Sequence, residues 1–207
     1  APDSWTDLDG DGRFTSKDRW EDKNGNGRFD AVWMAGFQNR RAAAGVHDER
    51  EAVAAVFDDG ALRVGIVAAD VVGLSRSFVL SVRAAYQEKL GLDYLLVHST
   101  HDHQGPDTQG LWGAGYLSSG VDDAYMEKLR SRMGEALAAA VAGLVPARLE
   151  TAEISGRDRR IGTVDTRGPQ VVDDGIRVAL VREAAGPGVL GTLVNFGNHV
   201  ELLWDRN

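Results

Sequence analysis

The chain of 207 residues contains no cysteine. Disulfide bonds and thiolate metal sites are therefore excluded, and any transition metal must be held by His, Asp, Glu or Tyr side chains. No apolar run approaches the length of a membrane span. The formal net charge of -8 comes without a basic cluster, which disfavours nucleic acid as a partner. The sequence also lacks the G-x-S-x-G elbow of serine hydrolases and a Walker-type phosphate loop.

What the sequence does contain, near its N-terminus, is a pair of acidic loops, DLDGDGRFTSKD from Asp7 and DKNGNGRFDAVW from Asp22. Calcium binds clustered hard oxygen atoms on a tightly turning backbone, and both loops have this composition. The candidate ligands are Asp7, Asp9, Asp11, the Arg13 carbonyl, Thr15 and Asp18 in the first loop, and Asp22, Asn24, Asn26, the Arg28 carbonyl and Asp30 in the second. Both loops depart from the EF-hand pattern at the last ligand position, which holds Asp18 in place of Glu in one and Trp33 in the other.

These loops allow two interpretations, a pair of calcium sites or a pair of Asp/Asn-Gly turns without an ion. Weak calcium sites function best where calcium is millimolar, so the first interpretation favours a secreted or periplasmic protein. An N-terminal Ala1 without methionine is compatible with a mature exported chain or with a trimmed one. We assign residues 1–35 to an EF-hand-like or dockerin-like calcium-loop segment attached to a larger domain.

The rest of the chain has an alternating pattern of strands and helices. Residues 51–69 predict a hairpin that turns at Asp58-Asp59-Gly60, with a second strand buried on both faces. A helix capped by Ser75 or Ser77 and a strand over 93–100 follow, which makes a β-α-β unit with parallel strands. A long helix after Asp122, a strand over 148–154 and a hairpin over 175–199 complete the pattern. The expected fold is a layered α/β domain, with a mixed sheet and helices packed on it.

Histidines are concentrated at the ends of two of these strands. His101, Asp102 and His103 follow the strand over 93–100, and His199 follows the last strand of the chain. Ligands of open α/β sheets bind outside the carboxyl ends of strands. If the two strands are neighbours, His101 or His103 can meet His199 and form part of a zinc site. The alternative is a hydrogen-bonded polar loop. His98, inside the strand, is expected in the core or behind the ligands, and nothing in the context of His47 requires a role.

Several segments resemble the neutral/alkaline (non-lysosomal) ceramidase family. STHDHQGPD is similar to the ATHTHSGPG segment of that family, and GTLVNFGNHVELLWDRN is similar to its second histidine segment. The segments DAVWMAGFQNRRAAAGVHDE, VAADVVGLSR and AAVAGLVPARLETAEISGRDRR also have counterparts in the same order. The resemblance implies that residues 36–207 are the N-terminal part of a ceramidase-like α/β hydrolytic domain.

The resemblance further implies a zinc enzyme that hydrolyses the amide bond of an N-acyl lipid by means of a zinc-activated water. His101 and His199 would bind zinc, and His103 would either support a zinc ligand from behind or orient the zinc-bound water. Asp102 would accept a proton or fix a ligand tautomer. Arg159 would contact the substrate or the developing oxyanion, although Asp158 replaces the Asn that precedes this Arg in the family. The other zinc ligands of the family, a Glu and a Tyr, lie beyond the second histidine and outside these 207 residues.

Two other functions are compatible with the sequence. One is a calcium-stabilised binding or scaffold protein with a degenerate site, and the other is one chain of a cleaved two-chain hydrolase whose second chain completes the domain. In the hydrolase, the loop DTQGLWGAGYLSSG would shape the substrate entrance. Its large side chains, which either contact an acyl chain or pack in the core, are Leu111, Trp112, Tyr116 and Leu117.

Overall fold

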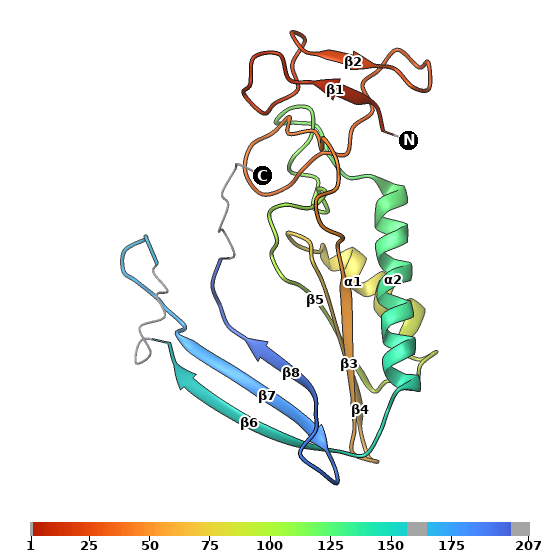
Figure 1. Ribbon diagram of the computed structural model, residues 1–207, viewed down its shortest axis with the longest axis vertical. Coiled ribbons are helices and arrows are strands. Elements are labelled where there is room, and N and C mark those ends of the chain that lie inside the picture. Colours follow the sequence, from red (N-terminus) through yellow and green to blue (C-terminus); the bar gives the residue numbers. More distant parts are fainter. Residues whose placement is uncertain (1, 157–164, 200–207) are drawn as a thin grey trace. The chain divides into compact units, whose positions relative to one another are not determined.

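The computed structural model describes residues 2–156 and 165–199 (Figure 1). These residues form two compact units, one that extends to Gly143 and one that comprises Leu144–His199. The boundary expected after residue 35 lies within the first unit and stays a prediction. Backbone hydrogen bonds join the N-terminal segment to the first unit, as between the N–H of Phe14 and the carbonyl of Arg40, 2.7 Å apart.

The two acidic loops are connected by a short antiparallel ribbon of β1 (Ser4–Thr6) and β2 (Arg19–Glu21), drawn in red in Figure 1. Trp5 lies opposite Trp20 in this ribbon. The sequence explains the symmetry, because residues 3–14 and 18–29 repeat the pattern D-x-W-x-D-x-[DN]-G-[DN]-G-R-F. Phe14 and Phe29, which occupy the same position of the repeat, stack with their ring centroids 3.6 Å apart.

The first unit is built on a mixed three-stranded sheet in the order β3-β4-β5. Strands β3 (Ala52–Asp58) and β4 (Arg63–Ala69) are antiparallel, whereas β5 (Tyr94–Ser99) runs parallel to β4. Helix α1 (Arg76–Tyr86) makes the crossover between β4 and β5, and its N-cap Ser75 accepts a hydrogen bond from the N–H of Phe78. The predicted hairpin, crossover and cap are therefore confirmed.

Helix α2 (Asp123–Ala142) packs along β3 and β4 (Figure 1). Its buried residues Leu129, Met133 and Leu137 recur every fourth position, so they form one stripe that faces the sheet. Gly134 allows α1 and α2 to approach closely, because a Cβ atom at this position would lie 2.1 Å from the Tyr86 ring. The core of the first unit lies between this helix pair and one face of the sheet.

The opposite face of the sheet is exposed in the described part of the chain. Val53, Tyr94 and Leu96 are each exposed by about half or more of their surface. Strand β4 alternates between buried and half-buried residues, so the prediction that both its faces are buried is wrong. Leu80 on α1 is also exposed.

The second unit contains an antiparallel meander of β6 (Ala147–Ser155), β7 (Gly175–Glu183) and β8 (Val189–Asn195). The order of elements expected from the sequence is confirmed, but the strands form separate sheets instead of one mixed sheet. The α/β fold class is correct, and an additional ribbon precedes it. Among the described residues, no helix has the length and apolar character needed to cross a membrane.

Candidate functional site

The histidine turn, residues 100–104, lies at the carboxyl end of the parallel strands β4 and β5. It runs beside the loop that follows β4, since the N–H of Thr100 donates to the Ala69 carbonyl and the N–H of Asp102 donates to the Val71 carbonyl. The Thr100 hydroxyl adds a bond of 3.1 Å to the carboxylate of Asp70. The turn therefore occupies the sheet edge where α/β folds place their ligands.

His101 is held in an uncommon backbone conformation, with a φ angle of 64°. Its Nδ1 lies 2.6 Å from the carbonyl oxygen of Val72. Because a carbonyl only accepts hydrogen bonds, Nδ1 carries the proton, and Nε2 of the neutral ring then presents its lone pair. An imidazole oriented by a backbone carbonyl in this way is suited to bind a metal through the other nitrogen.

His103 is buried, with 7% of its surface exposed. Its Nε2 lies 3.1 Å from His101 Nε2, and its ring packs edge-on against Phe37 with centroids 5.2 Å apart. Gly36 lies so close to the base of this side chain that a Cβ atom there would lie 2.4 Å from the Cβ of His103. With the proton of His101 on Nδ1, the Nε2–H of His103 donates to Nε2 of His101, and the role of His103 in orienting a zinc-bound water stays a prediction.

The other histidines are distributed differently from what the sequence suggested. His98 is exposed on β5, so its expected place in the core is wrong. His47 lies on an exposed loop and pairs with Asp48 through a contact of 2.7 Å. His199 follows β8 in the second unit, and β5 and β8 belong to different sheets, so the two strands are not neighbours in one sheet. The joining of His199 with His101 stays a prediction, and Arg159, with Asp158, lies outside the described residues.

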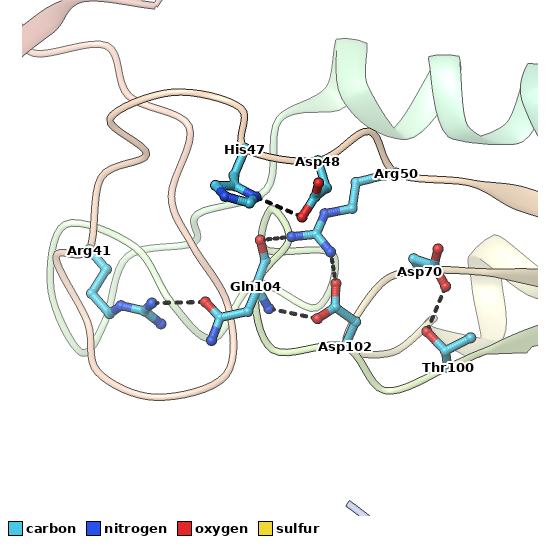
Figure 2. A network of polar contacts seen from close by, with 8 residues as sticks. All are labelled: Arg41, His47, Asp48, Arg50, Asp70, Thr100, Asp102 and Gln104. Carbon is cyan, nitrogen blue, oxygen red and sulfur yellow. Dashed lines mark hydrogen bonds and ion pairs between the residues drawn. The ribbon is translucent and has the colours of Figure 1, made fainter. Parts of the chain in front are cut away.

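Asp102 has a cationic partner that the sequence did not reveal. The Arg50 guanidinium donates through Nη1 to Asp102 Oδ2 and through Nη2 to the carbonyl of Gln104, as Figure 2 shows. Arg50 precedes β3 and is 52 positions away from Asp102, so no local pattern indicates the pair. Tyr125 on α2 lies within electrostatic range of this pair. Burial raises the pKa of its hydroxyl, with smaller effects from the charges of Arg50 and Asp102, so the hydroxyl stays protonated at neutral pH.

Asp107 organises the long loop after the histidine turn, and sequence reasoning also missed it. It is fully buried and accepts four backbone hydrogen bonds of 2.8–3.1 Å. The donors are the N–H groups of Gln109, Gly110, Trp112 and Gly120. An acidic residue that precedes a glycine-rich, uncharged stretch was the available signal. Asp107 therefore gives this loop a defined shape.

The large apolar side chains of that loop do not pack as core. Leu111 is 60% exposed, and Tyr116 and Leu117 are almost completely exposed. Trp112 is half-buried. Of the two interpretations of these residues, core packing is therefore wrong for Leu111, Tyr116 and Leu117, and contact with an acyl chain stays a prediction.

The first acidic loop brings three carboxylates together. Asp7, Asp9 and Asp11 each offer an oxygen atom, and these atoms lie within 4.8 Å of one another. Asp7 also shapes the turn, because it accepts hydrogen bonds of 2.8 Å from the N–H groups of Gly10 and Gly12. This concentration of hard oxygen atoms fits the ligand preference of calcium.

Asp18 stabilises the first loop through hydrogen bonds to its backbone. It is 8% exposed, and its two oxygen atoms accept from the N–H of Leu8 at 3.0 Å and of Thr15 at 2.7 Å. The hydrogen bond from Leu8 is the main cause that lowers the pKa of Asp18. This bonding gives Asp18 a structural role, and its role as a calcium ligand stays a prediction.

Asp3 does the same for the second loop. It is 6% exposed and accepts from the N–H of Lys23 at 2.9 Å and of Asp30 at 2.8 Å. Asp3 and Asp18 hold equivalent positions in the two repeats. Asp3 belongs to the first repeat and bonds to the backbone of the second loop, while Asp18 belongs to the second repeat and bonds to the backbone of the first loop. Each repeat therefore stabilises the loop of the other.

The second loop has the side-chain amides of Asn24 and Asn26 where the first loop has the carboxylates of Asp9 and Asp11. The side-chain amides of Asn24 and Asn26 donate to the same oxygen of Asp30, over 2.6 and 2.7 Å. Their amide oxygens accept from backbone N–H groups two residues further on. A cation in this loop would replace the two bonds to Asp30, so we expect weaker binding here than in the first loop.

No protein-family model matches the chain, and no curated protein matches it. Solved structures of ceramidase do share its fold. The crystal structure of neutral ceramidase from Pseudomonas aeruginosa matches with a TM-score of 0.67 and 22% sequence identity, over 86% of this chain and 31% of that one. A ceramidase complexed with C2 matches with a TM-score of 0.68 and 22% identity, over 86% of this chain and 30% of that one. The chain therefore has the fold of part of neutral ceramidase and spans less than a third of the length of these structures.

Proposed function

We propose that this chain is part of a ceramidase-like, zinc-dependent hydrolase that cleaves the amide bond of an N-acyl lipid. The observation that supports the proposal most directly is the arrangement of His101, whose Nδ1 is anchored on the Val72 carbonyl and whose Nε2 lies 3.1 Å from His103 Nε2. This pair lies at the carboxyl edge of a parallel strand pair, in a fold shared with neutral ceramidase.

In the proposed site, His101 and His199 hold the zinc ion. Zinc, when bound, polarises an amide carbonyl and acidifies a water molecule. Buried His103 orients the water, and Asp102 accepts a proton or fixes a tautomer. Arg159 contacts the substrate or the oxyanion. The exposed loop with Leu111, Tyr116 and Leu117 contacts the acyl chain, because large apolar side chains at a loop tip favour an apolar ligand.

Zinc binding by the purified chain tests this function. We expect His101→Ala and His199→Ala to weaken zinc binding at least about 100-fold, because loss of one imidazole leaves too few ligands to hold the ion. Isothermal titration with zinc and elemental analysis measure the effect. His47→Ala is the matched control, since His47 lies on an exposed loop and pairs only locally with Asp48.

Activity toward fluorescent N-acyl substrates provides the second measurement. If zinc is absent and both histidine variants retain the activity of the parent chain, the hydrolase proposal is refuted and a binding or scaffold protein is favoured. The cleaved two-chain hydrolase has a separate test, because mass spectrometry of native material would detect a second chain that copurifies.

The acidic loops support a calcium-stabilised N-terminal segment and, with it, a secreted or periplasmic location. We expect a chelator to lower the melting temperature, since calcium at 100 times its Kd stabilises the folded state by about 2.7 kcal/mol. Asp9→Asn should reduce this chelator-sensitive shift, because it removes one of the three clustered carboxylates. Differential scanning calorimetry measures both effects, and a melting temperature indifferent to the chelator would count against bound calcium.

A further inference from the structure

We infer that Arg50 is a positioning residue for the proposed metal site, which fixes the histidine turn in the conformation that presents His101 Nε2. The inference rests on the proposed function for the identity of the ligand atom. The contacts of Arg50, however, are independent of any bound metal. They concern the turn itself, which carries His101 and His103 on either side of Asp102.

The guanidinium of Arg50 bridges two groups of the turn (Figure 2). Nη1 donates to Asp102 Oδ2, and Nη2 donates to the backbone carbonyl of Gln104. The other oxygen of Asp102 accepts from the N–H of Gln104 at 3.1 Å. The peptide groups on both sides of Gln104 are thus held by Arg50 or by its carboxylate partner. Arg41 adds a bond of 3.3 Å to the side chain of Gln104.

The turn needs such restraint because His101 has a positive φ angle. This conformation costs about 1–3 kcal/mol in a residue with a side chain, and it persists where the surroundings over-determine it. On one side the restraint comes from the loop after β4, through the carbonyls of Val71 and Val72. Arg50 restrains the residues that follow His101, through its bonds to Asp102 and to the carbonyl of Gln104. The backbone of His101 is therefore held by the loop after β4 and by Arg50.

Arg50 is itself attached to a rigid element. The neighbouring Glu51 carbonyl accepts from the N–H of Asp70, 3.1 Å away, at the start of the loop that anchors His101. Strand β3 begins at Ala52, immediately beyond. Arg50 therefore ties the histidine turn to the same strand pair that carries the loop after β4.

The geometry requires arginine in particular. A planar guanidinium donates in two fixed directions at once, whereas a lysine ammonium is a point charge on a flexible stem. Lysine can pair with Asp102 but does not reproduce the fork that also holds the Gln104 carbonyl. We therefore expect that a positive charge at position 50 is not enough to hold the histidine turn in its conformation.

The test compares Arg50→Gln and Arg50→Lys with Arg63→Gln. Arg63 is a matched control, because it pairs with Asp58 at the far end of the same hairpin and its side chain is 34% exposed, against 31% for Arg50. We expect both Arg50 variants to bind zinc about 10- to 100-fold more weakly, the range for groups that orient metal ligands. Arg63→Gln should change the melting temperature without changing zinc affinity. Unchanged zinc affinity in Arg50→Gln would overturn the inference.

Chemical rescue separates positioning from general destabilisation. Guanidinium added at millimolar concentration should restore zinc affinity to Arg50→Ala, while methylammonium should not. Rescue by neither cation, or by both equally, would contradict the role of the fork.

Nitrogen NMR of the imidazoles keeps the test independent of zinc. In the metal-free parent chain, His101 should give the spectrum of a single Nδ1-protonated tautomer, and Arg50→Gln should give a mixture. If the parent chain binds no zinc but shows this change, the zinc function fails and the positioning role stands. A single tautomer in both proteins would refute the positioning role.

Discussion

Replacement of Asp107 by asparagine is expected to lower the free energy of unfolding by roughly 3–5 kcal/mol, which is a large part of the stability of a typical domain. One carboxylate oxygen of Asp107 accepts from two N–H groups, and the other accepts from the N–H groups of Trp112 and Gly120. Asparagine keeps one acceptor but turns an NH₂ group toward the other two donors. Urea denaturation followed by circular dichroism measures the loss.

The comparison variant is Asp59→Asn. Asp59 also accepts two backbone N–H groups, from Ala61 and Leu62, but with a single oxygen and on the exposed β3–β4 turn. Asparagine preserves that arrangement, so we expect a change within about 0.5 kcal/mol. Equal effects of the two substitutions would show that the buried carboxylate of Asp107 has no special role in the loop.

The second large effect is expected for Gly36→Ala. Gly36 has a φ angle of 103°, and its added Cβ atom would lie 2.4 Å from the Cβ and 2.9 Å from the Cα of His103. Backbone strain and overpacking each cost about 1–3 kcal/mol, so a loss of roughly 2–6 kcal/mol is expected, with displacement of His103. Thermal unfolding measures the stability, and NMR of the His103 ring detects the displacement.

Gly45→Ala controls for the loss of glycine in the same segment. Gly45 has no atom within 4 Å of an added Cβ and no positive φ angle. Its replacement should be neutral or stabilising by up to about 1 kcal/mol, because alanine restricts the unfolded chain. A Gly36→Ala protein as stable as Gly45→Ala would contradict the close approach of Gly36 to His103.

The sequence predicted where the helices and strands of this fold lie better than which of their residues are buried. Ser75, Asp122 and the Asp58-Asp59-Gly60 turn are local signals, and they mark the ends of α1, α2 and the β3–β4 hairpin as expected. Exposure depends on what covers each face, which a pattern along one chain does not record. For that reason His98, in an apolar strand, was expected in the core but lies on the exposed face.

The candidate site was predictable only in part, for a related reason. The residue types and strand-end position of His101 and His103 indicated a polar site, and the structure brings their rings together. Gly36 and Arg50 contact the histidine turn through tertiary contacts, whereas Asp107 shapes the loop that follows the turn. Gly36 and Arg50 reach the histidine turn across more than fifty positions of the chain, so their roles require the folded structure.

The exchange of Asp3 and Asp18 between the two acidic repeats has a consequence for any attempt to divide the N-terminal segment. A peptide that contains only residues 3–15 retains three clustered carboxylates but loses Asp18, and a peptide of residues 18–30 loses Asp3. Each peptide thus loses the carboxylate that accepts hydrogen bonds from the backbone N–H groups of its own loop. We therefore expect each loop to keep its shape only when both repeats are present, so that the two loops can be moved to another protein only together.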